Sequence, residues 1–354
     1  MKKTILFLLI TIFTNAQWSI STSERNALIS IYNQTDGANW SQSWDLEKDP
    51  YYWYGVKTLN GMVTELKLNG NLLKGNFPTS VFSLTNLKKL DLSSNKLYGE
   101  IPNLSSLSNL TYLNLSNNDF TGDVWSSYSN LPNLEEIYVG HNNCNISNTD
   151  FSGFSGLKSL DISKLNLTEI PASLGSLQKL SSLNVSNNAI VSFSNLSSLN
   201  QLQELNLANN NLNKVPSEII NFISLKSLDL SNNIITDFFF FFYLINLEWL
   251  SLENNSLQNI PNQVSNLQKL IHLNLGRNKI NGSTSILGTL NHLQQLWLNH
   301  NKLSGNIPQD LLALPNLMCL SLQSNELEGT IPNNIPQICN ISNNRFYKTH
   351  IVNF

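Results

Sequence analysis

The chain contains few cysteines and little charge. Three cysteines stand far apart in 354 residues, and an odd, widely spaced set does not form a disulfide framework. Only 13% of the residues are charged and the formal net charge is -3, so the concentrated Lys and Arg that nucleic-acid binding requires are missing. These two absences exclude a disulfide-stapled domain and argue against nucleic acid as a partner.

Catalytic patterns are missing as well. The five histidines are scattered, and none of them pairs with a cysteine or carboxylate at metal-ligand spacing: His141, His272, His292, His300 and His350. The sequence has no G-x-S-x-G nucleophile elbow, no glycine-rich phosphate loop and no catalytic cysteine context. We therefore expect no enzyme activity, no metal and no cofactor.

Long apolar runs are also lacking, apart from a short one at the start. Lys2 and Lys3 precede the apolar run 5–13, and Thr14-Asn15-Ala16 follows it. This order is typical of a secretory signal peptide over residues 1–16, and the run is too short to span a bilayer. We expect cleavage after Ala16, no transmembrane segment, and a secreted or cell-surface protein without a lipid anchor, because no cysteine follows the cut.

The sequence does contain one motif, L-x-x-L-x-L-x-x-N, which occurs twelve times. The last residues of neighbouring copies are 22 to 24 residues apart. A fixed period of this size indicates one supersecondary unit stacked on itself, here an α/β leucine-rich repeat solenoid. Eleven copies end in asparagine: Asn71, Asn95, Asn118, Asn142, Asn188, Asn210, Asn233, Asn255, Asn278, Asn301 and Asn325. Proteins of this architecture bind other molecules far more often than they transform them.

The alternation in L-x-L predicts a short strand whose leucines point inward. Stacking these strands in parallel gives a curved right-handed coil with a sheet on its concave face. The asparagines form a ladder, because an amide can donate to and accept from turn backbone groups that stacking buries. Leu165 stands where the ladder requires asparagine. We expect either that Asn166 compensates through a shifted turn or that this joint is the weakest in the stack.

The segments that connect one strand to the next follow two sequence patterns. Residues 97–102, 303–308 and 327–332 share L-x-G-x-I-P, which resembles the plant-type repeats of receptor ectodomains and polygalacturonase-inhibiting proteins. Residues 167–171, 212–216 and 257–261 lack the glycine, and their shorter form resembles the typical and bacterial classes.

An open solenoid end needs a cap, and residues 17–62 have the features of one. Ser21 and Glu24 form a capping box before a helical apolar pattern, and a tryptophan-rich segment follows. The segment resembles the cap of exported leucine-rich repeat proteins of Bacteroidetes-type bacteria. It lacks the paired cysteines of the similar plant receptor cap, so aromatic packing is expected instead. The solenoid of about 12–13 repeats is expected over 63–346, with a tail over 347–354.

Most outward strand positions are small or polar, and two clusters depart from this. Trp249, His272 and Trp297 fall on three successive strands, beside Glu253, Ile271 and Asn299. Two large aromatic residues on such a sheet fit a protein anchor or a platform for a sugar ring, although scattered exposed aromatics are common. A second cluster comprises Tyr112, Glu136 and Tyr138, with Lys88, Lys89 and Glu135 at its flank.

The run 238–243 is the least typical segment. Alignment of the repeats leaves Phe239, Phe240, Phe242 and Tyr243 near the surface. Contiguous exposed aromatics predict a patch for a partner or for self-association, and a neutral expansion on the convex side is the equal alternative.

The cysteines fit the repeat better than they fit redox chemistry. Cys144 and Cys339 take positions that other repeats fill with an inward Leu or Ile, so both are expected to be buried. Cys319 takes an outward strand position. The sequence thus predicts a binding module for a protein or polysaccharide, or alternatively a structural protein that self-associates, and its oligomeric state remains open.

Overall fold

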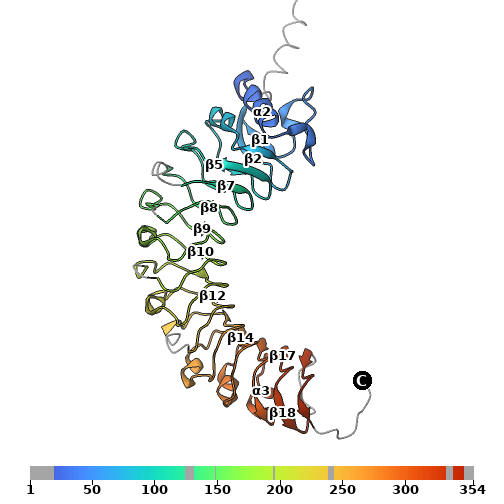
Figure 1. The fold of residues 1–354 in the computed structure, drawn as a ribbon, viewed down its shortest axis with the longest axis vertical. Helices are drawn as coiled ribbons and strands as arrows, with labels where there is room; N and C mark the ends of the chain where they lie inside the picture. The colour runs from blue at the N-terminus through green and yellow to red at the C-terminus, as the bar shows by residue number, and fades with distance from the viewer. Residues whose placement is uncertain are drawn as a thin grey trace, which may run out of the picture. The chain divides into compact units, whose positions relative to one another are not determined.

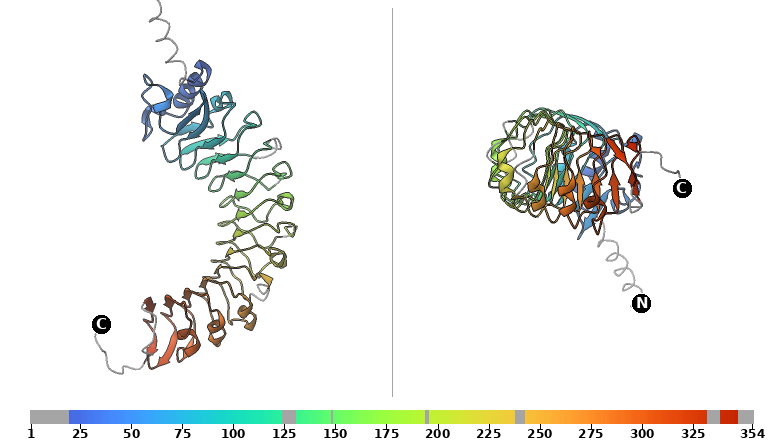
Figure 2. Two further views of the ribbon diagram at one scale, coloured as in Figure 1. Left: turned by 180° about the vertical axis from the view of Figure 1, so that it is seen from behind. Right: turned by 90° about the horizontal axis from the view of Figure 1, so that it is seen from below.

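The computed structural model describes residues 20–123, 131–147, 149–193, 196–237, 243–331 and 338–346. The chain divides into two compact units, Met1–Leu165 and Asn166–Phe354, which are described separately. In each unit a layer of strands lies on one side and loops with short 3-10 helices lie on the other (Figures 1 and 2).

The first unit begins with the helix predicted from the capping box. Helix α2 spans Thr22–Gln34, and the Oγ of Ser21 accepts a hydrogen bond from the Glu24 backbone N–H at 3.2 Å. Its buried face carries Glu24, Ala27, Leu28 and Ile31. The Glu24 carboxylate accepts the Val63 N–H at 3.2 Å, which ties the helix to the first long strand. Burial raises the pKa of Glu24, against the lowering effect of these hydrogen bonds.

A tryptophan cluster follows the helix and packs as the sequence predicted. The rings of Trp44 and Trp53 stack with their centroids 4.7 Å apart, and Trp40 meets Trp44 edge-on at 4.9 Å. All three rings are buried, and each indole N–H donates to a backbone carbonyl. Aromatic stacking therefore supplies the packing of this segment. The helices η1 (Gly37–Asn39) and η2 (Pro50–Tyr52) lie in this segment.

The strand layer of the first unit starts antiparallel and then becomes parallel. Strand β1 (Val56–Leu59) pairs antiparallel with β2 (Met62–Lys67). The parallel strands that follow are β4 (Lys89–Asp91), β6 (Tyr112–Asn114), β8 (Glu136–Tyr138) and β9 (Ser159–Asp161). A second parallel sheet consists of β3 (Lys74–Asn76), β5 (Lys96–Glu100) and β7 (Asp119–Thr121), and η3 spans Thr79–Ser83.

The second unit continues the same plan. Its strand layer consists of β10 (Ser182–Asn184), β11 (Glu204–Asn206), β12 (Ser227–Asp229), β13 (Trp249–Ser251), β14 (His272–Asn274), β15 (Gln295–Trp297), β17 (Cys319–Ser321) and β19 (Ile338–Asn340). The opposite side carries η4 (Ala172–Ser176), η5 (Ser217–Asn221), η7 (Asn262–Asn266), η8 (Ser285–Thr289) and α3 (Gln309–Leu312).

The L-x-G-x-I-P repeats build additional strands that the shorter repeats lack. In the second unit, β16 (Ser304–Gly305), β18 (Glu326–Gly329) and β20 (Arg345–Phe346) pair in parallel, as β5 does in the first. Gly99, the next-to-last residue of β5, and Gly329, the last residue of β18, have φ values of +78° and +86°, a left-handed conformation that strains other residues. The glycine therefore separates the two repeat types structurally.

The ladder asparagines bridge neighbouring repeats through their side chains. Asn233 Nδ2 donates to the carbonyls of Leu207, Leu230 and Ser231 at 3.0, 3.1 and 3.2 Å, and its Oδ1 accepts the Leu212 N–H at 3.0 Å. Asn344 makes the same bonds at the end of β19's repeat, although that copy lacks the leucines of the motif. At the other end, Asn71 bonds to the backbone of Gln42 in the cap.

The Leu165 position departs from what we expected of Asn166. Leu165 is buried, whereas Asn166 is exposed in a left-handed conformation at φ +58°. The Asn166 side chain therefore does not take the buried place of a ladder amide, and the apolar side chain of Leu165 fills its own position. The parallel strand layers and the buried leucines confirm the predicted leucine-rich repeat solenoid.

Burial makes a specific prediction for cysteine chemistry. Cys144 is buried as predicted, and burial raises the pKa of its thiol to about 12. Because the thiolate is the reactive species, we expect iodoacetamide at about pH 8 to leave Cys144 unmodified in the folded protein and to alkylate it after denaturation. Peptide mass spectrometry measures both states, and labelling of Cys144 before unfolding would contradict its buried position. The inward orientation of Cys339, on β19, stays a prediction.

Candidate functional site

The outward side chains of the strands form what we call the sheet face, arranged in two rows. In the second unit the backbone register places the first residue of each strand in a first row: Ser182, Glu204, Ser227, Trp249, His272, Gln295 and Cys319. The third residue of each strand forms a second row: Asn184, Asn206, Asp229, Ser251, Asn274, Trp297 and Ser321.

Asp and Asn in the second row have a structural task. The Oδ1 of Asp229 accepts the Ser231 N–H at 2.9 Å, and the Oδ1 of Asn206 accepts the Ala208 N–H at 3.0 Å. The same bond recurs at Asn274 with Gly276 at 3.0 Å. An indole ring cannot accept this bond, so Trp297 gives up an interaction worth about 1 kcal/mol. A departure with that cost favours a role for Trp297 in binding.

The predicted aromatic cluster lies on three successive strands, but in two rows. Trp249 and His272 are direct neighbours in the first row, and Trp297 lies in the second row beside Asn274. All three side chains are half-buried, as is Ile271, which directly precedes β14. The strand spacing and rise put the Cα atoms of the two tryptophans roughly 12 Å apart. The two tryptophans therefore lie at two separate points of the sheet face.

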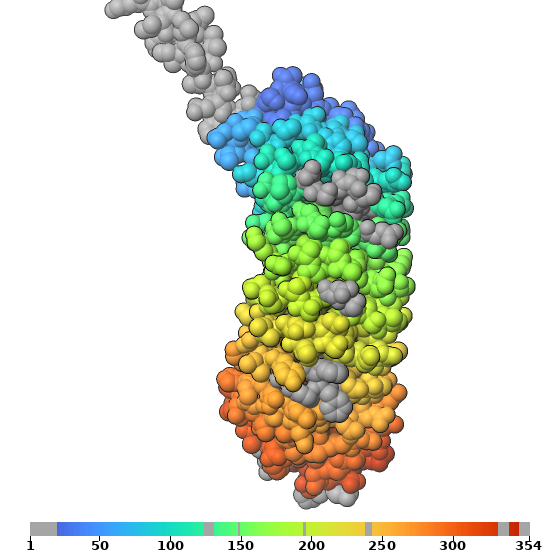
Figure 3. All heavy atoms as spheres, turned by 90° about the vertical axis from the view of Figure 1, so that its left-hand side faces the viewer, coloured from blue at the N-terminus to red at the C-terminus, as the bar shows by residue number. Residues whose placement is uncertain are grey.

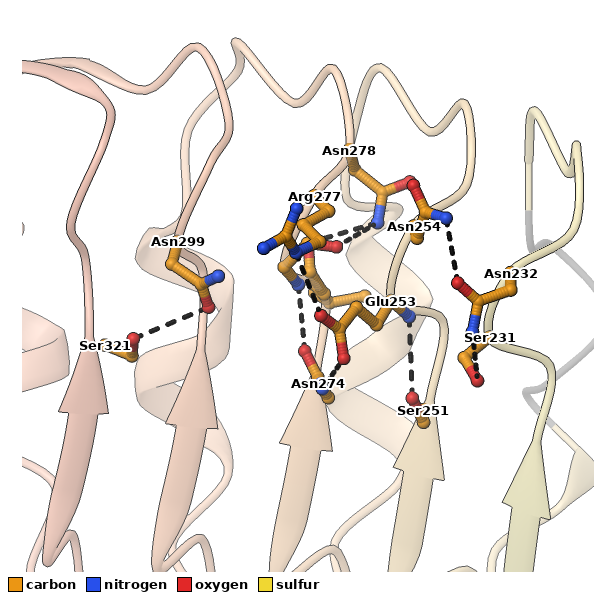
Figure 4. A network of polar contacts seen from close by, with 12 residues as sticks. Ser231, Asn232, Ser251, Glu253, Asn254, Asn274, Arg277, Asn278, Asn299 and Ser321 are labelled. Carbon is orange, nitrogen blue, oxygen red and sulfur yellow. Dashed lines mark hydrogen bonds and ion pairs between the residues drawn. The ribbon is translucent and has the colours of Figure 1, made fainter. Parts of the chain in front are cut away.

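A polar network flanks this cluster at the ends of the strands (Figure 4). The Glu253 carboxylate accepts a hydrogen bond from Asn274 Nδ2 at 2.9 Å and pairs with Arg277 Nε at 3.4 Å. Nearby, Ser321 Oγ donates to the Oδ1 of Asn299 at 3.4 Å. Two predicted site residues, Glu253 and Asn299, thus already have protein partners, and a ligand must share or displace these contacts.

The sheet face of the second unit is hollowed beside Trp249. A depression of about 400 Å³, which we call the β10–β13 hollow, is lined by Ser182, Leu183, Asn184, Glu204, Leu205, Asn206, Ser227, Asp229 and Trp249. Its floor is made of strand leucines and its walls are short polar side chains, with the indole at one end. Sequence reasoning missed this site because its Ser, Asn and Asp residues match the repeat consensus. The run of short outward residues next to one tryptophan was the available signal.

The second predicted cluster comes together in the first unit. The rings of Tyr112 and Tyr138 lie 5.6 Å apart at 45°, and the Tyr138 hydroxyl donates to Glu136 Oε2 at 2.9 Å. Tyr112 lies near Asp91, with 3.5 Å between its hydroxyl and Oδ2. Of the flanking residues, Glu135 pairs with Lys158 at 2.9 Å. Tyrosine pairs with adjacent carboxylates can contact both the apolar and the polar part of a ligand.

The tyrosine cluster predicts a specific alkaline transition. Burial raises the pKa of Tyr138 from 10 to about 12; a hydrogen bond with Ser159 opposes this effect, and the hydrogen bond and charge of Glu136 add to it. The folded state retains this proton more strongly than the unfolded state, so the resulting stability is complete below pH 10 and is lost as pH rises through about 12. Tyr138→Phe lacks this contribution, and we expect its unfolding midpoint to fall less steeply over that window. Equal slopes in parallel denaturant titrations would contradict the assignment.

The predicted Phe-rich patch is described in part. Phe239, Phe240 and Phe242 lie outside the described residues, whereas Tyr243 is 63% exposed. Ile223 and Ile245, at equivalent positions of consecutive repeats, are also exposed. The loop side of the molecule, opposite the strands, is the face seen in Figure 3.

The described residues contain neither a metal-binding group of side chains nor a helix that could cross a membrane. Among the residues that the structure describes, no group of three or more His, Cys, Asp or Glu side chains could hold a metal ion. Within the same residues, no helix has the length and apolar character needed to cross a membrane.

Comparisons with known proteins agree with the repeat pattern. Family models described as leucine-rich repeats match residues 85–130, 155–212, 200–241, 246–267, 292–314 and 316–338. The calmodulin-binding receptor kinase CaMRLK of Arabidopsis thaliana is 30% identical over 186 residues, which are 51% of this chain and 27% of the relative. The matched segments span between 7% and 27% of the curated relatives' lengths.

Solved structures show the same architecture. The ectodomain of the plant membrane receptor kinase GASSHO1/SCHENGEN3 from Arabidopsis thaliana, in complex with CASPARIAN STRIP INTEGRITY FACTOR 2, is 30% identical, with a TM-score of 0.65 over 80% of this chain and 38% of that one. A leucine-rich repeat protein of Leptospira interrogans is 28% identical, with a TM-score of 0.71 over 77% of this chain and 71% of that one. The chain is a leucine-rich repeat protein, with repeats similar to those of plant receptor ectodomains and of bacterial proteins.

Proposed function

We propose that this chain is an extracellular binding module that recognises a protein or glycan on the sheet face of its repeats. The observation that carries this proposal is the pair of departures on a sheet face that is otherwise short and polar. Trp249 stands beside the β10–β13 hollow, and Trp297 replaces a residue type that closes its own turn elsewhere. Large aromatic side chains at such positions are the usual anchors of binding energy.

The similar proteins support a binding role. GASSHO1/SCHENGEN3 is described in complex with a partner factor, and it shares the ectodomain architecture. A rigid stack of repeats presents a preformed surface, so little ordering entropy opposes binding. The tyrosine cluster of the first unit is a second contact region in this proposal, centred on Tyr112, Glu136 and Tyr138. No step of the proposed function requires catalysis.

The proposed location and domain limits follow from the sequence pattern. A signal peptide over residues 1–16 would direct export and be removed after Ala16, leaving a cap over 17–62, a solenoid over 63–346 and a tail over 347–354. We also propose, from the sequence resemblance of residues 17–62, a relationship with the exported leucine-rich repeat proteins of Bacteroidetes-type bacteria. Mass spectrometry of the secreted protein tests this: a mature N-terminus at Gln17 is expected, and retention of residues 1–16 would contradict it.

Affinity capture tests the binding role. The purified chain is immobilised against extracellular proteins and polysaccharides, next to the Trp249→Ala/Trp297→Ala variant. Loss of two aromatic anchors is expected to weaken capture by about a hundredfold. Tyr98→Ala is the matched control. Tyr98 is an exposed aromatic residue on β5, which belongs to the second parallel sheet and not to the sheet face. Unchanged capture by the double variant would remove the aromatic site from the proposal.

One observation favours a second candidate, self-association through the loop side. Tyr243, Ile223 and Ile245 are 63%, 58% and 56% exposed within two consecutive repeats. Such an apolar cluster is suited to a second copy of the chain or another partner. Analytical ultracentrifugation at micromolar concentration tests it: a dimer that dissociates in Phe239→Ser/Tyr243→Ser supports self-association, and a monomer in both proteins rejects it.

A further inference from the structure

Building on the proposed function, we propose that the β10–β13 hollow binds one or two sugar rings of a neutral glycan, with one ring stacked on Trp249. Its volume of about 400 Å³ falls within the range of about 300–1,000 Å³ typical of small-ligand sites. The hollow lies entirely on the sheet face of the second unit. It exists because the three neighbouring strands β10 to β12 carry outward side chains smaller than the indole that the fourth strand carries.

The hydrogen-bonding groups of the hollow suit a polyol. Asp229 and Asn206 each use Oδ1 to close their own turns, at 2.9 and 3.0 Å. Within the described part of the chain, the remaining Asp229 Oδ2, Asn206 Nδ2 and Ser227 Oγ have no protein partner. An acceptor, a donor and a hydroxyl therefore face the same depression on adjacent strands. A sugar hydroxyl both donates and accepts, so vicinal hydroxyls can satisfy this mixed set.

The charge of the hollow selects against other ligand classes. Its lining contains the carboxylates of Glu204 and Asp229 and contains neither Lys nor Arg, so an anionic ligand is repelled. A single ammonium or guanidinium group would occupy a small part of 400 Å³. It would also leave Asn206 and Ser227 unmatched, because a cation offers no acceptor to the amide N–H. A neutral ligand with many hydroxyls matches both the size and the polar groups.

Trp249 supplies the apolar contact that a sugar ring needs. Its side chain is half-buried, so packing fixes the ring while one part stays accessible. The axial C–H groups of a pyranose form an apolar face that can lie on an aromatic ring, while its hydroxyls point to the sides. In the hollow those hydroxyls would meet the groups of β12, which pairs with β13, and of β11, which is the next strand beyond β12.

Calorimetry and tryptophan fluorescence with defined probes test this assignment. The probes are the neutral hexamers of glucose (α-1,4 and β-1,4), mannose and N-acetylglucosamine, an oligogalacturonate, and an arginine-rich peptide. We expect at least one neutral hexamer to bind, with an affinity nearly constant from about 50 to about 500 mM salt, since an uncharged ligand is not screened. Trp249→Ala and Ser227→Trp, which fills the hollow, should each weaken that binding by about tenfold or more. Glu169→Gln, at an exposed carboxylate outside the hollow, is the control.

The outcomes separate this inference from the proposed function. Absence of binding by every neutral hexamer at about 10 mM, or binding that both variants leave unchanged, overturns the glycan assignment. Salt-sensitive binding of the arginine-rich peptide that requires Trp249 also overturns it, but leaves the binding module intact. If binding of neither the hexamers nor the captured extracellular partners depends on Trp249 or Trp297, both the glycan assignment and the proposed aromatic binding site are wrong. Circular dichroism confirms that the variants are folded.

Discussion

Replacing Asn233 with alanine is expected to destabilise the second unit by about 3–5 kcal/mol, because four hydrogen bonds disappear and several buried backbone groups lose their partner. The amide donates to the carbonyls of Leu207, Leu230 and Ser231 and accepts from the N–H of Leu212. Leu212 is fully buried, so its N–H has no access to water. These bonds reach into the preceding repeat, and the loss is therefore expected to weaken two repeats together.

Chemical denaturation followed by circular dichroism measures this effect. Asn221→Ala is the matched control, because Asn221 lies in the same repeat region but is exposed and makes one bond, to the Glu218 carbonyl at 3.2 Å. The control is expected to stay within about 0.5 kcal/mol of the parent protein. If both variants unfolded at the same denaturant concentration as the parent, the ladder would contribute nothing measurable.

Trp44→Ala is the second substitution with a large expected effect, again about 3–5 kcal/mol, because it opens a cavity in the aromatic core of the cap. The Trp44 ring stacks on Trp53, meets Trp40 edge-on and donates through Nε1 to the Tyr54 carbonyl at 2.9 Å. Among the residues that the structure describes, Trp44 is the ring that contacts both Trp40 and Trp53. A loosened cap would expose the apolar end of the first unit, so increased aggregation is expected together with the lower stability.

Thermal unfolding with light scattering measures both consequences. The control is Tyr52→Ala, at an aromatic residue of the same cap that is 74% exposed and whose ring contacts Tyr51. This substitution is expected to change stability by less than about 0.5 kcal/mol. A Trp44→Ala variant as stable as Tyr52→Ala would show that the helix alone, and not the aromatic cluster, closes this end.

The fold was predictable because its signal is local and repeated. Each L-x-L triplet determines both the position of a strand and the face that its leucines bury, so β4, β6, β8 to β15 and β17 follow directly from the motif. The repeat ending at Asn344 was weaker in sequence because Pro336, Cys339 and Ile341 replace its leucines, yet the amide completes the ladder. The additional parallel sheets were not predicted, since they depend on pairing between segments that vary in length and composition.

The candidate site was predictable only in part. Aromatic residues stand out against a repeat consensus, so Trp249, Trp297 and the Tyr112/Tyr138 pair could be found from spacing alone. The hollow could not be predicted, because it is a space left open by several residues that match the repeat consensus. The two tryptophans lie in different rows because Trp249 precedes the L-x-L of its repeat, whereas Trp297 lies between the two leucines.

The two rows of the sheet face differ in a way that bears on how such a protein can change its ligand. Side chains of the second row, such as Asp229 and Asn274, close the turn that follows them, whereas first-row side chains such as Ser227 and Gln295 have no such bond. Substitutions in the first row can therefore alter specificity at little cost to folding. New affinities could be selected there one position at a time, in nature or in a library, while the second row preserves the scaffold.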